Sequence, residues 1–165
     1  MNERLIDKYA YKRAYARLRR FTPITADCGR LCRKRCCKGG MGEGMILFPG
    51  EPLFGSLSVT DKVMCGFPVR FAVCKGRCKR ETRPLSCRIY PFAPYLGADG
   101  RLNIIADPRA KYICPLLAES AQALISRRFL IAVEAAFDDL LYEENMIPML
   151  EAYARMLDEY RRFTG

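Results

Sequence analysis

The chain has 165 residues, half of them hydrophobic, which is enough to bury one core and predicts a single domain over residues 1–165. Its formal net charge is +10. The longest apolar run, FLIAV at residues 129–133, is far shorter than the roughly 20 residues that a membrane span needs. Residues 1–20 carry charge throughout and lack the apolar centre of a signal peptide. We therefore expect a cytoplasmic protein that does not enter the membrane.

Residues 1–22 form the first predicted element. Within residues 3–21, apolar side chains recur at steps of three and four, which is the pattern of an amphipathic helix; they are Ile6, Ala10, Ala14, Leu18 and Phe21. The following Thr22-Pro23 indicates its end. Three tyrosines on this helix, Tyr9, Tyr11 and Tyr15, are expected to pack against the core with their hydroxyls at its edge.

Eight of the nine cysteines fall between Cys28 and Cys87. In a reducing cytoplasm such crowding is more typical of a metal or catalytic site than of a disulfide framework, and the odd total agrees. Histidine is absent, which excludes His-dependent triads and the usual His-containing zinc sites. The sequence therefore predicts metal binding by thiolates. Disulfides are the alternative if the compartment is oxidising.

The first cysteine group has offsets of four, four and one, in Cys28, Cys32, Cys36 and Cys37. On a straight helix the first three line one face, with the outer two about 12 Å apart. Thiolates that share one zinc ion approach within roughly 4 Å of each other. Either the ligands are divided between sites, or the centre is polynuclear, or the segment is a loop. The adjacent Cys36 and Cys37 project in different directions, which suits two sites or one ligand and one supporting thiol.

A second cysteine group consists of Cys74, Cys78 and Cys87. Basic residues surround both groups, at residues 30–38 and 75–88, whereas the C-terminal third is acidic. Cations near a thiolate lower its pKa and offset the charge of a multi-thiolate site. A basic stripe is equally typical of a surface for nucleic acid or for an acidic partner protein. Nucleic acid is the less favoured partner because no recognised reading motif accompanies the charge.

The central region, residues 23–115, is predicted to be irregular with short strands. Glycine and proline flank a strand at 45–48, and Glu51 is expected to be an exposed loop glutamate. The glycines permit close backbone approach and positive φ. Residues 63–73 predict one or two strands carrying Cys65. Prolines favour turns over a helix at 74–94, and a hairpin of 92–96 with 101–106 is expected around Asp99-Gly100.

Residues 116–165 are predicted to be helical. Residues 116–142 are almost continuously apolar, which indicates one long buried helix or two shorter ones. Pro148 fits the first turn of a last helix, whose apolar stripe is Met149, Leu150, Tyr153, Met156, Leu157, Tyr160 and Phe163. The predicted fold class is α-rich α+β, in which N- and C-terminal helices enclose an irregular, cysteine-bearing metal-binding centre with short β-strands.

The segments CGRLCRKRCC, GMILFPGE and RPLSCRIYPF, together with Cys74 and Cys78, resemble the YkgJ-type cysteine-cluster family. That family is described as zinc- or iron-chelating, and flagellin lysine-N-methylases carry a similar domain. The resemblance covers residues 28–114 and implies the metal ligands Cys28, Cys32, Cys36, Cys37, Cys65, Cys74, Cys78 and Cys87, with Cys114 as a ninth candidate. The usual first motif, C-x2-C-C or C-x2-C-x2-C-C, has shorter gaps, so the first ligand is Cys28 or Cys32.

The leading hypothesis is a cysteine-thiolate protein that binds zinc or an iron–sulfur cluster. The absence of C-x2-C pairs leans slightly towards iron–sulfur. Arg83 and Arg88 are expected beside the metal, where they tune thiolate charge or tie the loop to carboxylates; the alternative is that either arginine simply pairs with Glu81 or with a C-terminal acid. A second hypothesis is an enzyme, or an accessory to one, in protein methylation or redox chemistry. A third is binding of nucleic acid or an acidic partner, with a structural metal.

Overall fold

A computed structural model of the chain describes residues 8–165 except 41, 56 and 77. Helices and small antiparallel sheets are mixed, which agrees with the α+β class. The α-helices are α1 (Lys8–Leu18), α2 (Gly29–Cys32), α3 (Leu85–Ile89), α4 (Arg127–Leu140) and α5 (Met146–Thr164). The strands are β1 (Gly44–Leu47), β2 (Ser58–Met64), β3 (Phe67–Val73), β4 (Phe92–Leu96) and β5 (Leu102–Ala106). Short 3₁₀ turns lie at η1 (Arg35–Cys37), η2 (Arg80–Thr82), η3 (Pro108–Ala110), η4 (Pro115–Leu117) and η5 (Glu119–Leu124).

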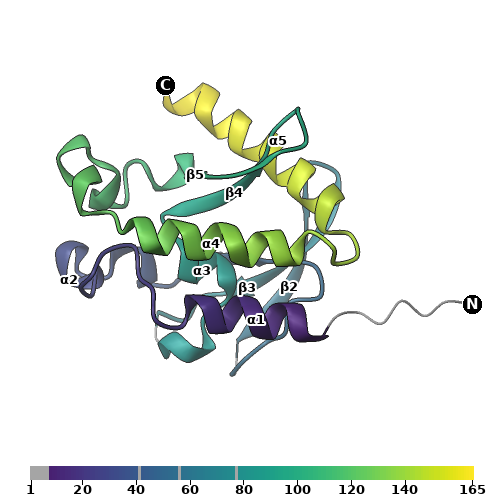
Figure 1. Cartoon of the computed structure of the whole chain (residues 1–165), viewed down its shortest axis with the longest axis horizontal. Coiled ribbons are helices and arrows are strands. Elements are labelled where there is room, and N and C mark those ends of the chain that lie inside the picture. The colour runs from purple at the N-terminus through teal and green to yellow at the C-terminus, as the bar shows by residue number, and fades with distance from the viewer. Residues whose placement is uncertain (1–7, 41, 56, 77) are drawn as a thin grey trace, which may run out of the picture.

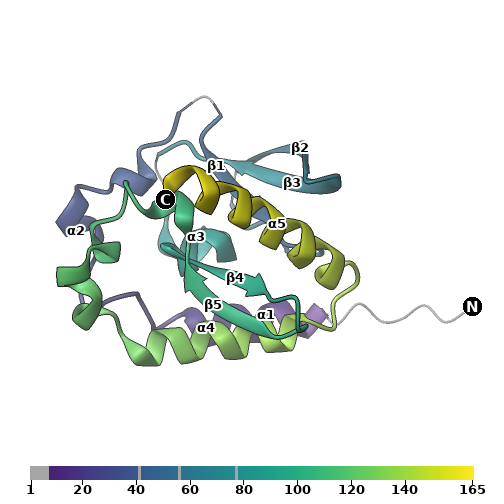
Figure 2. The same ribbon diagram turned by 90° about the horizontal axis from the view of Figure 1, so that it is seen from above.

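Two antiparallel sheets flank the longest helix. The first has the strand order β1-β3-β2, and the second is the β4-β5 hairpin. Helix α5 packs against β2 and β3 on one side and β4 on the other, while α4 lies against β5 and α1 (Figures 1 and 2). The core fills the space between these layers. Among the described residues, no helix combines the length and apolarity that crossing a membrane requires.

Both hairpins follow from their turn residues. The predicted β4-β5 hairpin is confirmed, with Phe92 opposite Ala106. In the β2-β3 hairpin, Cys65 and Gly66 adopt left-handed φ angles of 46° and 81°, as a two-residue turn requires. Strand β2 begins at Ser58, before the predicted residue 63, because its first residues pair with β3 through the backbone. Their side chains are mostly exposed and polar, so the apolar pattern of the sequence did not indicate them.

The terminal helices partly match the periodicity. Ala10, Ala14 and Leu18 are buried in α1 as predicted, but the helix ends at Leu18 rather than at residue 21. The predicted start, including Ile6, lies outside the described residues. Pro148 stands in the first turn of α5 as predicted. The end of the predicted stripe was wrong, since Phe163 is 89% exposed where α5 runs past the core.

Residues 116–142 do not form one buried helix. The first part makes the 3₁₀ turns η4 and η5, and only Arg127–Leu140 is α-helical. The start of α4 is fixed by Ser126, whose hydroxyl accepts a hydrogen bond from the Phe129 N–H at 3.3 Å. The apolar composition of residues 116–125 therefore misled the prediction.

Glu51 is buried, with 1% of its surface exposed, and is not the exposed loop glutamate that the sequence indicated. Its carboxylate accepts hydrogen bonds from the Tyr15 hydroxyl at 2.6 Å, the Phe48 N–H at 2.9 Å and the Leu85 N–H at 2.7 Å. Burial raises the pKa of Glu51, and these three donors offset that rise only in part. One side chain thus joins α1, the end of β1 and the start of α3.

Replacement of Glu51 by alanine should destabilise the fold by about 3 kcal/mol or more, because three buried donors lose their acceptor. Urea unfolding followed by circular dichroism measures this, since the chain has no tryptophan. The exposed Glu159→Ala on α5 is the control and should change the free energy of unfolding by less than about 0.5 kcal/mol. Equal effects of the two substitutions would contradict this role of Glu51.

Candidate functional site

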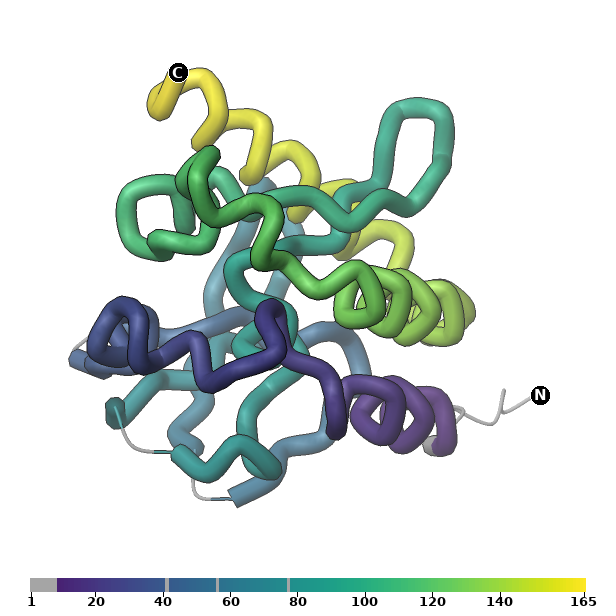
Figure 3. The backbone as a smooth tube through the Cα atoms, turned by 60° about the vertical axis from the view of Figure 1, so that its left-hand side comes forward, coloured from purple at the N-terminus to yellow at the C-terminus, as the bar shows by residue number. Residues whose placement is uncertain are grey.

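The first cysteine segment is bent rather than straight. Helix α2 ends at Cys32, Arg33 and Lys34 then take left-handed φ angles of 51° and 55°, and η1 begins at Arg35. The Lys34 N–H donates to the Gly29 carbonyl at 2.9 Å, which closes the bend. Cys32 and Cys36 therefore do not continue one helical face, and the 12 Å separation expected for a straight helix does not apply. Figure 3 shows this dark blue segment at one edge of the molecule.

The segment after Cys74 packs directly against the segment after Cys37 through glycines. Gly39 and Gly76 have φ angles of 69° and 75°. A Cβ on Gly39 would clash with the backbone nitrogen of Gly76, and a Cβ on Gly76 would clash with the Lys38 carbonyl oxygen. The predicted close approach of the glycine-rich segment is therefore confirmed at Gly39. It brings the residues after Cys37 against those after Cys74.

Cys87 lies on α3, within the region where prolines predicted turns and no helix. Pro84 precedes the first helical residue, where a proline is tolerated because no intrahelical N–H is needed. Burial raises the pKa of Cys87 to about 12, and the charges of Cys37, Cys78 and Cys74 contribute to the rise. Cys87 is therefore within electrostatic reach of thiols from both other segments.

Cys28, Cys32 and Cys114 form a neighbouring set. Burial raises the pKa of Cys28, and the charge of Cys114 raises it further, followed by that of Cys32. Cys32 also raises the pKa of Cys114, after burial. Helix α2 lies beside the green 3₁₀ turns that follow Cys114 (Figures 1 and 2). The ninth cysteine thus belongs to this end of the molecule.

The adjacent pair Cys36 and Cys37 lies between the two sets, with 3.8 Å between the two sulfur atoms. The hydrogen bond between the two thiols lowers the pKa of Cys37 to about 6 against the effect of burial, and the charges of Arg83 and Lys34 act in the same direction. The pKa of Cys36 is raised by the same hydrogen bond and by burial. Cys37 is therefore the thiol best placed to carry negative charge.

Cys65 lies apart from the other cysteines. It forms the turn at one end of β3, whereas Cys74 follows the opposite end of that strand. At about 3.3 Å per residue, β3 separates the two by more than about 20 Å. The Cys65 carbonyl accepts a hydrogen bond from Arg155 at 3.4 Å, and its side chain packs against the core. The structure therefore does not bring Cys65, one of the ligands that the resemblance implies, together with Cys74.

Arg83 faces the thiols, whereas Arg88 does not. Burial alone would lower the pKa of Arg83, but its hydrogen bond to Cys78 and the charges of Cys37, Cys78 and Cys87 raise it. The Nε of Arg83 is buried without a hydrogen-bond partner in the described part of the chain. Arg83 borders an open cavity of about 360 Å³, whose other lining residues are Lys34, Cys37, Gly76, Cys78 and Lys79.

Arg88 holds the loop before α3. Its Nε donates to the Arg83 carbonyl at 3.1 Å, and another of its nitrogens donates to the Glu81 carbonyl at 2.9 Å. Its guanidinium also lies over the Tyr15 ring, 4.6 Å from the centroid. The predicted tie is therefore made to backbone oxygens rather than to carboxylates. Arg88 positions the loop that carries Arg83.

The donor chemistry of these residues suits zinc or iron, because soft thiolates select those metals. All nine cysteines are free of disulfides. Within residues 8–165, leaving out 41, 56 and 77, no three Cys, Asp or Glu side chains are arranged as a preformed metal site. A metal would therefore require the thiols to move closer together than they are in this structure.

No protein-family model matches the chain, and comparison with curated proteins and with solved structures found no significant similarity. The YkgJ-type resemblance stays a prediction from the motifs.

Gly39→Ala and Gly76→Ala should each destabilise the protein by about 2 kcal/mol more than Gly42→Ala, because a methyl group forces the two cysteine segments apart. Gly42 is a matched control: its φ is 80°, and no described atom lies within 4 Å of an added Cβ. Urea unfolding gives the free energies, and reaction with a thiol reagent reports opening of the segments. Equal costs at all three glycines would show that only the positive φ matters.

Proposed function

We propose that the protein binds a metal through cysteine thiolates, either as zinc or as an iron–sulfur cluster. The observation that carries the proposal is the convergence of thiols from four separate parts of the chain. They fall into two sets. The first is Cys28, Cys32 and Cys114, and the second is Cys37, Cys74, Cys78 and Cys87. Cys36, the neighbour of Cys37, links the two sets electrostatically.

The electrostatics of these thiols favour a bound cation. Several thiolates at one place repel each other, and their mutual charges raise the pKa of Cys28 and Cys87 beyond the effect of burial. A metal ion offsets that repulsion and takes the place of the protons. The set around Cys37 has four thiols, the number that closes a structural zinc site or holds one cluster.

Cysteines that bind metal must remain reduced, so the proposal includes a reducing compartment such as the cytoplasm. Motif spacing still leans slightly towards iron–sulfur. The YkgJ-type resemblance supports the same class of protein. In this proposal Cys65 has no ligand role, and Arg83 lies next to the metal.

A second candidate is binding of an acidic partner, in line with the exposed Arg30, Arg33 and Arg35 around α2. A local role for the basic charge has the stronger support, because Lys34, Lys79 and Arg83 line the same cavity as Cys37 and Cys78. That cavity also leaves room for catalysis beside the metal, but no observation assigns a reaction.

Protein purified without oxygen should contain iron with labile sulfide and absorb visible light, or should contain stoichiometric zinc and be colourless. Elemental analysis and an absorption spectrum distinguish the two. Removal of the metal by a chelator should lower the melting temperature, because a metal that binds only the folded state stabilises it. Metal-free protein that gains no stability from added zinc or iron would overturn the proposal.

Cys87→Ser should remove at least one metal ion or cluster, whereas Cys65→Ser should keep the full content. The apparent affinity for Zn²⁺ should rise between about pH 6 and about pH 8, since a raised thiol pKa means that the metal must displace a proton. Calorimetry in buffers of different ionisation enthalpy counts the protons released, and Cys87→Ser should release fewer. Equal metal loss in both variants would contradict the assignment of ligands.

A further inference from the structure

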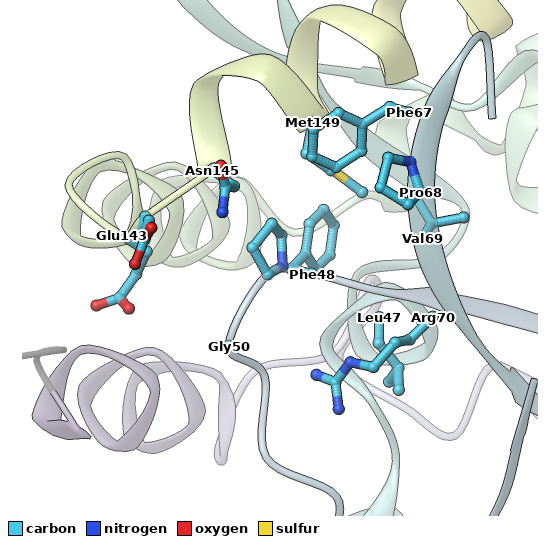
Figure 4. Close-up of a pocket in the computed structure, with 12 residues that line it drawn as sticks. Leu47, Phe48, Gly50, Phe67, Pro68, Val69, Arg70, Glu143, Asn145 and Met149 are labelled. Atoms are coloured by element: carbon cyan, nitrogen blue, oxygen red, sulfur yellow. The ribbon is translucent and has the colours of Figure 1, made fainter. Parts of the chain in front are cut away.

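A second cavity, of about 370 Å³, lies near the end of β3 that is remote from Cys74. It is bordered by the residues after β1, the start of β3 and the turn between α4 and α5. Figure 4 shows Phe48 and Met149 among the lining residues, but both are fully buried, so Phe67 and Pro68 supply accessible apolar surface at one wall. Its size and largely apolar walls are those of a small-molecule site.

One charged wall of this cavity is Arg70, whose orientation is fixed. A terminal nitrogen of Arg70 donates to the Glu51 carbonyl at 2.7 Å, and the Glu51 side chain is itself held by three buried hydrogen bonds. The other guanidinium donors remain in the same plane, which suits a carboxylate. Arg70 is therefore a cation held in place by the fold rather than a mobile surface side chain.

The opposite wall is acidic. Glu143, Glu144 and Asn145 follow one another in the α4–α5 turn and line the same cavity. Glu143 is 8% exposed, and Gly50, with a φ of 73°, passes close to its carboxylate. Figure 4 shows Glu143 and Asn145 on the α4–α5 side and Arg70 on the β3 side.

The two walls are near enough to act on one group. Burial raises the pKa of Tyr11, the charges of Glu51 and Glu143 raise it further, and that of Arg70 opposes them. The Tyr11 hydroxyl donates to the Pro49 carbonyl, so it marks a fixed point beside the cavity. The cavity therefore presents a cation, an apolar surface and an anion among its lining residues.

We propose that this cavity binds a small zwitterion with an apolar side chain, of the amino-acid or dipeptide class. Its carboxylate binds Arg70, its ammonium group faces Glu144 and the rest of the α4–α5 turn, and its side chain packs against Phe67 and Pro68, which are accessible apolar residues of the lining. A purely anionic ligand would be repelled by the acidic wall, and a purely cationic one by Arg70.

This site is separate from the proposed metal function. The described lining residues include no cysteine, so metal-free and metal-loaded protein should bind the zwitterion equally. Failure of the metal proposal would leave this inference unchanged, and the reverse also holds.

The test uses the full chain and four probes: L-leucine, L-leucyl-L-leucine, N-acetyl-L-leucine and L-leucinamide. Saturation-transfer NMR and calorimetry should detect leucine or the dipeptide with a Kd below about 1 mM, and whichever of these two binds more tightly gives the class of ligand. N-acetyl-leucine lacks the ammonium charge and leucinamide lacks the carboxylate, so each should bind about tenfold more weakly than leucine.

Two variants test the walls separately. Glu144 is exposed, and Glu144→Gln should abolish the preference for leucine over N-acetyl-leucine. Arg70→Gln should abolish the preference for leucine over leucinamide. The controls Glu159→Gln and Arg101→Gln lie outside the cavity lining and should bind like the parent. If Arg70→Gln unfolds, Glu144→Gln alone still decides. No binding of either zwitterion at about 10 mM, or equal binding of the capped probes, would overturn the proposal.

Discussion

The buried carboxylate of Glu51 connects the parts of the structure that matter for function. It binds the Tyr15 hydroxyl of α1, the backbone at the end of β1 and the first residue of α3. Its own carbonyl holds Arg70 at the apolar cavity, and α3 carries Cys87 to the thiol cluster. A carboxyl group at 1% exposure is tolerated because its hydrogen bonds replace those it would make to water. Both candidate sites therefore depend on this one interaction.

Strand β3 separates the two candidate sites. Phe67 and Arg70 near its start line the apolar cavity, and Cys74 follows its other end. The same geometry places Cys65 and Cys74 apart although only eight residues lie between them in sequence. At the cysteine end, Gly39 and Gly76 allow two backbones to meet without intervening side chains. The electrostatic result is a thiol cluster in which the pKa of Cys87 is raised and that of Cys37, next to Lys34 and Arg83, is lowered.

Local patterns predicted several elements correctly. The Asp99-Gly100 turn specified the β4-β5 hairpin, and the spacing of Ala10, Ala14 and Leu18 specified the buried face of α1. Composition failed to predict the secondary structure of two segments. Residues 116–125 form 3₁₀ turns rather than an α-helix, and Cys87 lies on a helix in a proline-rich region. Of residues 116–125 only Leu116 is buried, so their apolar composition predicted neither their burial nor their backbone, which depends on hydrogen bonds made after packing.

The sequence by itself determined the mixed α+β class, the concentration of thiols and basic charge, and the absence of histidine, since these follow from composition and short-range periodicity. Only the tertiary structure decided that Glu51 is buried, that Cys114 joins the thiols and that Cys65 does not. It also decided that Arg70 and Glu144 face one cavity. These relations join residues that are distant in sequence, and local spacing carries no information about which of them meet.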